Sequence, residues 1–515
     1  MRLTVSGTDT VGSLLTRHAE RRPGATFLTF EAADGTLAER SWGEAATRAF
    51  RMAHLLASEG VGPGDRVHVH LVNCPEFYDC WFGCAVLGAV MVPTNPLLTR
   101  SELGYELEHS ACVVSVTEPA LAGAVLDARP AGLREVSVAR TEEFEAALST
   151  QPRGPVGRGL RPEDVAAILY TSGTTSRPKG VMVTHANYLY AGEVVAGHLR
   201  IREDDRWLVV LPLFHANAQY YSTMSALVSG ASIALTERFS ASRWSQQAAR
   251  HRATVASLFA APIRMILAQD PHPDDGHNDL RAVIFSQNVT EEQLGDFERR
   301  FGCPLLQLYG MTETIAPPTL NPLNGDRRNM TIGRPTLPSH VRVVDESGRD
   351  VSEGDVGELL VQGVPGRTLM AGYLDDPEAT AASIRDGWLH TGDSVVVDPD
   401  GFIRFVDRAK DMIKRAGENV AATEVEAVVN SHPCVFESAA IGVPDEMRDE
   451  AIKVYVVLHP GDEVTEEGII VWCRERLARF KVPSSVEFVD GLPRTSVGKI
   501  RKEALRTASK DGGTR

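Results

Sequence analysis

A loop rich in hydroxyl groups and glycine follows an apolar stretch near residue 170 and is suited to bind phosphate. Residues 170–180 read Tyr-Thr-Ser-Gly-Thr-Thr-Ser-Arg-Pro-Lys-Gly. Gly173 allows a tight turn, N–H and hydroxyl groups can donate to phosphate oxygens, and Lys179 adds positive charge. The hydroxyls are those of Thr171, Ser172, Thr174 and Thr175. The Walker A spacing G-x-x-x-x-G-K-[ST] does not occur, and taken alone the cluster can also be a surface turn.

Further short segments carry side chains suited to nucleotide chemistry. These segments contain His215, residues 308–313 (Leu-Tyr-Gly-Met-Thr-Glu), Asp393, residues 407–419 and Lys499. Each has a plain structural reading: a lone histidine among apolar residues is commonly a core histidine, and a charged run is commonly a solvated linker. The chemical interpretation therefore depends on finding all of them in one chain.

Together these segments resemble the signature motifs of the adenylate-forming superfamily, which includes acyl-CoA synthetases, firefly-type luciferases and nonribosomal peptide adenylation domains. The motifs follow the family's order from Tyr170 to Lys499, and the likeness before Tyr170 is weaker. Ser176 stands where the usual pattern has glycine, which stiffens the loop. The ending Ser-Arg-Pro-Lys-Gly resembles the crotonobetaine/carnitine-CoA ligase branch.

The resemblance implies roles for the residues of the large domain. Tyr309 would stack on adenine, because an aromatic face suits a purine. The neighbouring Gly310 and Met311 would also belong to the ATP site. Thr312 would contact the α-phosphate, and Glu313 would hold Mg²⁺ together with Thr175, since a hard cation prefers oxygen ligands. His215 would close the acid pocket near the reacting carboxylate. Asp393 would accept hydrogen bonds from both ribose hydroxyls, with Arg408 also reaching the ribose.

The same resemblance implies a small mobile domain that works in two steps. Lys499 would bridge the carboxylate and the α-phosphate during adenylation, offsetting the charge that develops there. Lys410 would be the hinge. Lys414 and the segment Gly417-Glu418-Asn419 would swing in for the second step, and Gly417 would leave room for pantetheine because it has no side chain.

The acid pocket departs most from the family pattern. Relatives carry small glycine and alanine residues after the strand expected at 282–285, whereas this chain has Ser286, Gln287 and Asn288. We assign these three residues to the nucleotide and acid site. Their bulky amides should shorten the pocket and favour a small polar acid over a long fatty acid.

The resemblance implies a two-step reaction with ATP, Mg²⁺ and coenzyme A. A carboxylate attacks the α-phosphorus of ATP and releases pyrophosphate, and a thiol then attacks the mixed anhydride and releases AMP. An alternative is an adenylating enzyme that does not use CoA, such as an amide-forming ligase or a diazotase that activates nitrite for an aryl amine. A nucleotide-binding protein without catalytic activity is the third reading, which the complete set of catalytic residue types disfavours.

The elements that position these residues alternate between strand and helix patterns. Helical spacing is expected at 11–21, and strands at 66–71, 165–170, 207–211, 232–236 and 282–285, consistent with parallel sheets in α/β layers. Short strands with turns after about residue 331, such as 341–344 and 357–361, indicate a small β-barrel-like module. We predict an α/β fold with a large AMP-binding domain at 1–407 and a small α+β domain at 408–515.

Composition restricts the function classes further. A chain of 515 residues with 43% hydrophobic residues should fold as several domains, and a net charge of −15 disfavours a nucleic-acid surface. Seven scattered cysteines without metal spacing are expected to be reduced and buried. With no signal peptide or membrane span expected, the predicted location is cytoplasmic. A homodimer is allowed by the sequence, which leaves the oligomeric state open.

Overall fold

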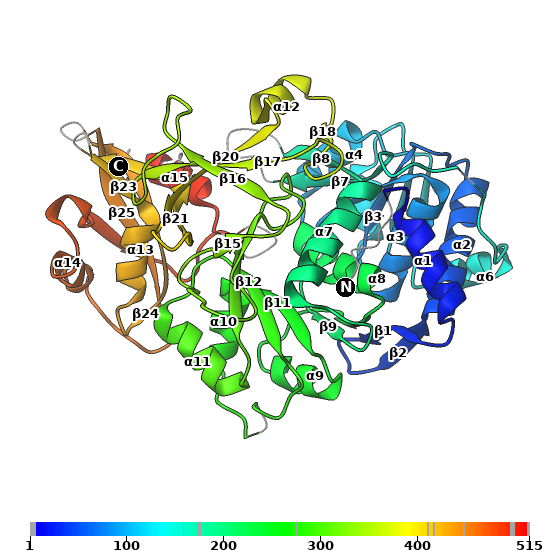
Figure 1. Ribbon diagram of the computed structural model, residues 1–515, viewed down its shortest axis with the longest axis horizontal. Coiled ribbons are helices and arrows are strands. Elements are labelled where there is room, and N and C mark those ends of the chain that lie inside the picture. Colours follow the sequence, from blue (N-terminus) through cyan, green and yellow to red (C-terminus); the bar gives the residue numbers. More distant parts are fainter. Residues whose placement is uncertain are drawn as a thin grey trace.

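The computed structural model describes residues 7–157, 159–171, 178–273, 275–408, 411–415, 418–445, 449–494 and 500–511. It is a mixed α/β protein with a large N-terminal part and a smaller C-terminal part at one end of the molecule (Figure 1). The predicted fold class is confirmed. Of the seven free cysteines, six are buried as expected, and Cys434 is half-buried.

The largest sheet has nine strands and carries several of the predicted site residues. Its order is β15-β14-β13-β12-β11-β9-β10-β1-β2, and the neighbours from β13 to β1 are parallel. These inner strands are almost continuously apolar, as expected for parallel strands covered on both faces. The strands are β1 (Thr26–Glu31), β2 (Leu37–Ser41), β9 (Arg206–Val209), β10 (Ser232–Thr236), β11 (Val255–Phe259), β12 (Ala282–Ser286), β13 (Leu305–Tyr309), β14 (Thr319–Leu320) and β15 (Arg334–Pro335).

A second sheet of seven strands carries the two sides of the phosphate loop. Its order is β18-β8-β7-β4-β3-β5-β6, with β8 antiparallel to β7 and the strands from β7 to β6 parallel. β7 and β8 flank the loop predicted to bind phosphate. The strands are β3 (Arg66–His70), β4 (Val90–Pro93), β5 (Val114–Thr117), β6 (Glu135–Val138), β7 (Val165–Thr171), β8 (Lys179–Thr184) and β18 (Gly372–Tyr373).

Helices join the two sheets through one aromatic core. Trp42 lies 4.6 Å from Phe27 of β1, and Trp81 lies 5.1 Å from Tyr188, between ring centroids. The first helix covers the predicted residues and begins at a capping box made by Thr10. The helices are α1 (Val11–Arg21), α2 (Trp42–Ser58), α3 (Pro75–Leu87), α4 (Arg100–His109), α5 (Ala122–Ala128), α6 (Glu142–Thr150), α7 (His185–Leu199), the π-helix η1 (Asn217–Thr223), α8 (Met224–Ser229), α9 (Trp244–Arg250), α10 (Ala260–Leu267), α11 (Glu291–Phe301) and α12 (Pro377–Ser383).

The short strands expected after residue 331 form a five-stranded antiparallel sheet. Its order is β16-β17-β20-β19, and β21 pairs with β20. The sheet lies between the large sheets and the small domain (Figure 1). Its strands are β16 (His340–Val344), β17 (Val356–Gln362), β19 (Ile384–Arg385), β20 (Trp388–Val397) and β21 (Ile403–Arg408).

The C-terminal part has a core of its own around a further five-stranded sheet, ordered β23-β22-β25-β24 with β26 beside β25. Within the residues described, none of the helices is both long enough and apolar enough to cross a bilayer. The elements are β22 (Met412–Arg415), β23 (Glu418–Ala421), α13 (Ala422–Asn430), β24 (Val435–Asp445), β25 (Asp449–Leu458), α14 (Glu466–Arg474), the 3₁₀ turn η2 (Arg479–Lys481), β26 (Ser485–Phe488) and α15 (Lys502–Asp511).

Candidate active site

Three residues predicted for the site, His215, Ser286 and Tyr309, lie together with Phe259 at the carboxyl ends of neighbouring parallel strands. β9, β11, β12 and β13 are consecutive in the sheet, and ligands of such sheets bind at that edge. Phe259, Ser286 and Tyr309 end their strands, and His215 follows β9 by a short turn. The His215 and Phe259 rings meet edge to face with centroids 5.6 Å apart. Topology therefore gathers residues that are nearly a hundred positions apart into one edge.

The π-helix η1 shapes the loop that follows β13. A Cβ on Gly310 would lie 2.2 Å from the Tyr221 hydroxyl, so no side chain fits there. The Tyr220 hydroxyl donates to the Thr312 carbonyl at 3.3 Å. Sequence reasoning missed both tyrosines, since no periodicity in the chain marks a π-helix, although such turns frequently occur at functional sites.

Tyr309 joins the nine-stranded sheet to the five-stranded sheet. Its hydroxyl donates to Asp393 Oδ2 at 2.5 Å, and its ring is stacked near Phe405 with centroids 6.4 Å apart. Asp393 on β20 faces Arg408 on β21 in the pairing register. The residues predicted for adenine and for the ribose hydroxyls are therefore neighbours in space.

Tyr373 links Glu313 to the end of the phosphate loop. Its hydroxyl donates to Glu313 Oε1 at 3.0 Å, and Lys179 Nζ lies 4.7 Å from the centroid of its ring. β18 pairs with β8, which sets Tyr373 opposite Val181. Burial raises the pKa of the Tyr373 phenol and the Glu313 charge raises it further, so the hydroxyl stays a donor. The sequence held no signal for this residue, because only the sheet pairing brings it to Glu313.

The loop after β12 holds an amide side chain whose nitrogen is buried. Gln287 has a left-handed backbone, with φ 75°, and among the described residues its side-chain Nε2 is buried without a hydrogen-bond partner. Gln307 Nε2 holds the loop by donating to the Gln287 carbonyl at 3.0 Å and to Asn288 Oδ1 at 3.1 Å. Asn288 is exposed and Ser286 half-buried. Of the two amides expected to line the acid pocket, only Gln287 is therefore partly buried.

Several predicted residues lie outside the described part of the chain, namely Ser172, Gly173, Thr174, Thr175, Lys410, Gly417 and Lys499. For Arg408, Lys414 and Glu418 the backbone alone is described, with Lys414 and Glu418 on the paired strands β22 and β23. On either side of residues 495–499 the chain is paired: Arg494 forms a bridge with Ile500, and the Arg501 N–H donates to the Pro493 carbonyl at 2.7 Å.

Helix α4 contacts the stretch just before Lys179, at one end of the phosphate loop. The Tyr105 hydroxyl donates to the Pro178 carbonyl at 3.1 Å. The pKa of Glu102 is lowered by the Thr99 N–H and hydroxyl, and Arg501 of the small domain lowers it further. The charge of Arg501 therefore acts on the helix that also contacts the stretch before Lys179.

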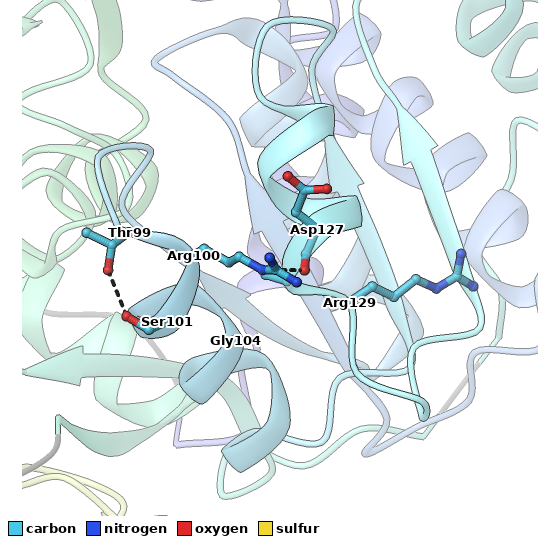
Figure 2. A pocket seen from close by; sticks show the side chains of 7 residues that line it. Thr99, Arg100, Ser101, Gly104, Asp127 and Arg129 are labelled. Carbon is cyan, nitrogen blue, oxygen red and sulfur yellow. Dashed lines mark hydrogen bonds between the residues drawn. The ribbon is translucent and has the colours of Figure 1, made fainter.

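A hollow of about 570 Å³ lies beside this helix, between α4 and the end of α5 (Figure 2). Its two arginines are engaged by main-chain carbonyls: Arg100 Nε donates to Asp127 and Arg129 Nε to Leu133, both at 2.9 Å. None of the predicted site residues lines it.

Models of known protein families match two long stretches of this chain. A family model described as AMP-binding enzyme matches residues 15–374, and one described as AMP-binding enzyme C-terminal domain matches residues 424–499. The chain belongs to the AMP-binding enzyme family. Crotonobetaine/carnitine–CoA ligases from Salmonella arizonae and Proteus mirabilis are 39% and 40% identical to this member, each over 93% of this chain and 96% of the relative. The predicted resemblance to that branch is confirmed.

Solved structures of the family superpose on nearly the whole chain. ATP-bound MatB from Rhodopseudomonas palustris has a TM-score of 0.89 at 28% identity and covers 98% of this chain and 99% of its own. The anthranilate CoA ligase AuaEII in complex with anthranoyl-AMP has a TM-score of 0.90 at 26% identity, with both chains fully covered. This AMP-binding enzyme is therefore an AMP-forming ligase of the acyl-CoA synthetase type.

Proposed function

We propose that this AMP-binding enzyme activates a small polar carboxylic acid with MgATP and transfers the acyl group to coenzyme A. The observation that carries the proposal is the hydrogen bond between Tyr309 and Asp393, opposite Arg408. This bond places an aromatic face beside a carboxylate that can accept hydrogen bonds from two ribose hydroxyls. One nucleoside can therefore stack its base on Tyr309 and bind its ribose to Asp393.

The triphosphate would lie between the loop at 171–180 and Glu313. Lys179 supplies positive charge, and the hydroxyls and N–H groups of Thr171 to Thr175 supply donors. Glu313 is a buried carboxylate held by Tyr373, which fits a hard cation, so Glu313 and Thr175 would hold Mg²⁺. The Thr312 hydroxyl would contact the α-phosphate.

The small domain would supply different residues to the two steps. We set its boundary after Asp407, with Lys410 as the hinge. Lys499 would neutralise charge on the carboxylate and the α-phosphate in the first step. Lys414, Gly417 and Glu418 would face the thiol in the second.

The acid pocket would discriminate by hydrogen bonding. His215 would close the side near the reacting carboxylate, and the buried Gln287 amide offers a donor that an acceptor group on the acid would satisfy. A site with an unpaired buried donor rejects an apolar analogue strongly. Because the relatives are crotonobetaine/carnitine–CoA ligases, we propose small acids such as carnitine and crotonobetaine as the first substrates to test.

A pyrophosphate-exchange assay over a panel of acids tests the proposal. The panel should hold short polar acids, betaines, aryl acids and fatty acids, each with and without CoA. We expect exchange with one class of short polar acids and consumption of the free thiol when CoA is added. Exchange only with long-chain fatty acids would contradict the assignment of the pocket.

The second candidate is an adenylating enzyme with another acceptor, an amine or, after activation of nitrite, an aryl amine. It shares the whole nucleotide site with the ligase. Formation of AMP without loss of CoA thiol, together with stimulation by an amine, would favour it over the thioester reaction.

A further inference from the structure

Two buried amide side chains fix the turn that leads from β9 to His215. Asn73 accepts the Leu213 N–H at 2.8 Å and donates to the Leu211 carbonyl at 3.1 Å. Gln219, on η1, donates its Nε2 to the Leu213 carbonyl at 2.7 Å. Because both amides are buried, water does not compete for these bonds, and the backbone of the turn is held in one arrangement.

The imidazole of His215 accepts a hydrogen bond from the first residue of η1. The Asn217 N–H donates to His215 Nδ1 at 3.2 Å. A ring nitrogen that accepts a hydrogen bond carries no proton, so the neutral ring carries its proton on Nε2. The edge-to-face contact with Phe259 restricts the rotation of the ring. His215 is therefore held as an Nε2–H donor.

The residue that sets this tautomer is bonded to the neighbouring strand. The Ser257 hydroxyl on β11 donates to Asn217 Oδ1 at 2.7 Å, and both side chains are buried. Ser257 lies two residues before Phe259 in the same strand. One strand thus holds both Asn217 and the aromatic ring that packs on His215.

We propose that Asn217 and Ser257 are positioning residues for acyl-adenylate formation, which hold His215 as a neutral Nε2–H donor to the reacting carboxylate. The inference rests on the proposed place of His215 beside that carboxylate. An ionised acid needs no base, so the proton stays on Nε2 while a carboxylate oxygen attacks the α-phosphorus and pyrophosphate leaves. The contribution of His215 is then to orient the nucleophile.

The tautomer can be measured without acid, ATP or CoA. Protein labelled with nitrogen-15 at its histidines is studied by two-bond proton–nitrogen correlation at pH 8, above the ordinary histidine pKa of about 6.5. The His215 signals are those lost in His215→Asn. We expect an unprotonated Nδ1 and a protonated Nε2, and in Ser257→Ala the two nitrogen shifts should move toward each other as the second tautomer becomes populated. A protonated Nδ1 in the parent, or unchanged shifts in Ser257→Ala, would overturn the proposal.

Two amide replacements of His215 separate the roles of its ring nitrogens. The amide nitrogen of glutamine can occupy the place of Nε2, whereas that of asparagine reaches only the place of Nδ1. With an acid accepted in the panel, His215→Gln should therefore release pyrophosphate about tenfold faster than His215→Asn. Equal rates, or a faster His215→Asn, would overturn the donor role.

The kinetic constants of Ser257→Ala distinguish positioning from general loss of structure. We expect kcat for pyrophosphate release to fall roughly tenfold while KM for ATP stays within about twofold, because the change acts on the acid and not on the nucleotide. Ser115→Ala is the matched control, since it removes a buried hydroxyl that lies 2.7 Å from His68 Nδ1 in the seven-stranded sheet. It should leave the His215 shifts and both constants unchanged. An equal fall of kcat in the two variants would contradict the positioning role of Ser257.

Failure of this inference and failure of the proposed function give different results. If no acid in the panel supports pyrophosphate exchange, the proposed substrate class fails, while the nitrogen shifts still decide whether Asn217 and Ser257 set the tautomer. If the parent releases pyrophosphate but forms no thioester, the CoA proposal fails and the comparison of His215→Gln with His215→Asn still decides the donor role.

Discussion

The Tyr373 hydroxyl donates a hydrogen bond of 3.0 Å to Glu313, across two segments that are 60 residues apart. The same ring lies beneath Lys179 at 4.7 Å. One phenol thus orients the carboxylate proposed for Mg²⁺ and contacts the cation proposed for the triphosphate. A hydrogen bond to a charged group is worth roughly 1.5–3 kcal/mol.

Removal of this hydroxyl should weaken the use of MgATP. We expect Tyr373→Phe to lower kcat/KM for ATP in pyrophosphate release by roughly ten- to a hundredfold, with part of the loss recovered at high Mg²⁺. Tyr78→Phe is the matched control, because it loses a buried hydroxyl that is bonded to Thr223 at 3.1 Å in the core. Equal losses in both variants would argue against a special role for Tyr373.

The contact between Gly310 and Tyr221 predicts a rescue. Gly310→Ala should impair adenylation strongly, because its Cβ would lie 2.2 Å from the Tyr221 hydroxyl. The next atoms are 3.5 Å away, which is ordinary contact, so the double variant Gly310→Ala/Tyr221→Phe should recover much of the activity. Pyrophosphate release by the three variants checks this, and no recovery in the double variant would show that glycine is needed for another reason.

The bond from Tyr309 to Asp393 should hold the ribose carboxylate in place. Tyr309→Phe keeps the aromatic face and loses the 2.5 Å hydrogen bond, so we expect a rise of about tenfold in KM for ATP and little change in KM for the acid. Initial rates with each substrate varied in turn measure both constants. A rise in the KM for the acid alone would contradict a nucleotide role.

The buried Glu106 should make stability depend on pH. Burial raises the pKa of this carboxyl to about 8 and the neighbouring Glu102 adds to the shift. Between its ordinary value of 4.5 and about 8, the unfolded chain releases the proton while the folded chain retains it, so stability falls as pH rises through this window. Glu106→Gln should therefore stabilise the fold at pH 8, on the order of a few kcal/mol, and much less at pH 5.

Chemical denaturation at both pH values measures this difference. Glu108→Gln, on the exposed side of the same helix, is the control and should change stability little at either pH. A stabilisation by Glu106→Gln that is the same at pH 5 and pH 8 would contradict a retained proton.

The sequence by itself determined the local elements and the order of the motif loops. Apolar runs marked β7, β10 and β12 to within a residue, because buried parallel strands need continuous apolar side chains. Apolar residues at helical spacing marked α1. The motifs then implied an adenylate-forming enzyme, since residue types and spacing are local properties of the chain.

Only the tertiary structure decided which distant side chains meet. Tyr373 reaches Glu313 because β18 pairs with β8, and Tyr221 reaches Gly310 because a π-helix turns it there. The start of α11 and residues 430–433 of the small domain line one groove although about 140 positions separate them. Such contacts depend on strand order and on the packing of whole elements, and neither is encoded in any short stretch of sequence.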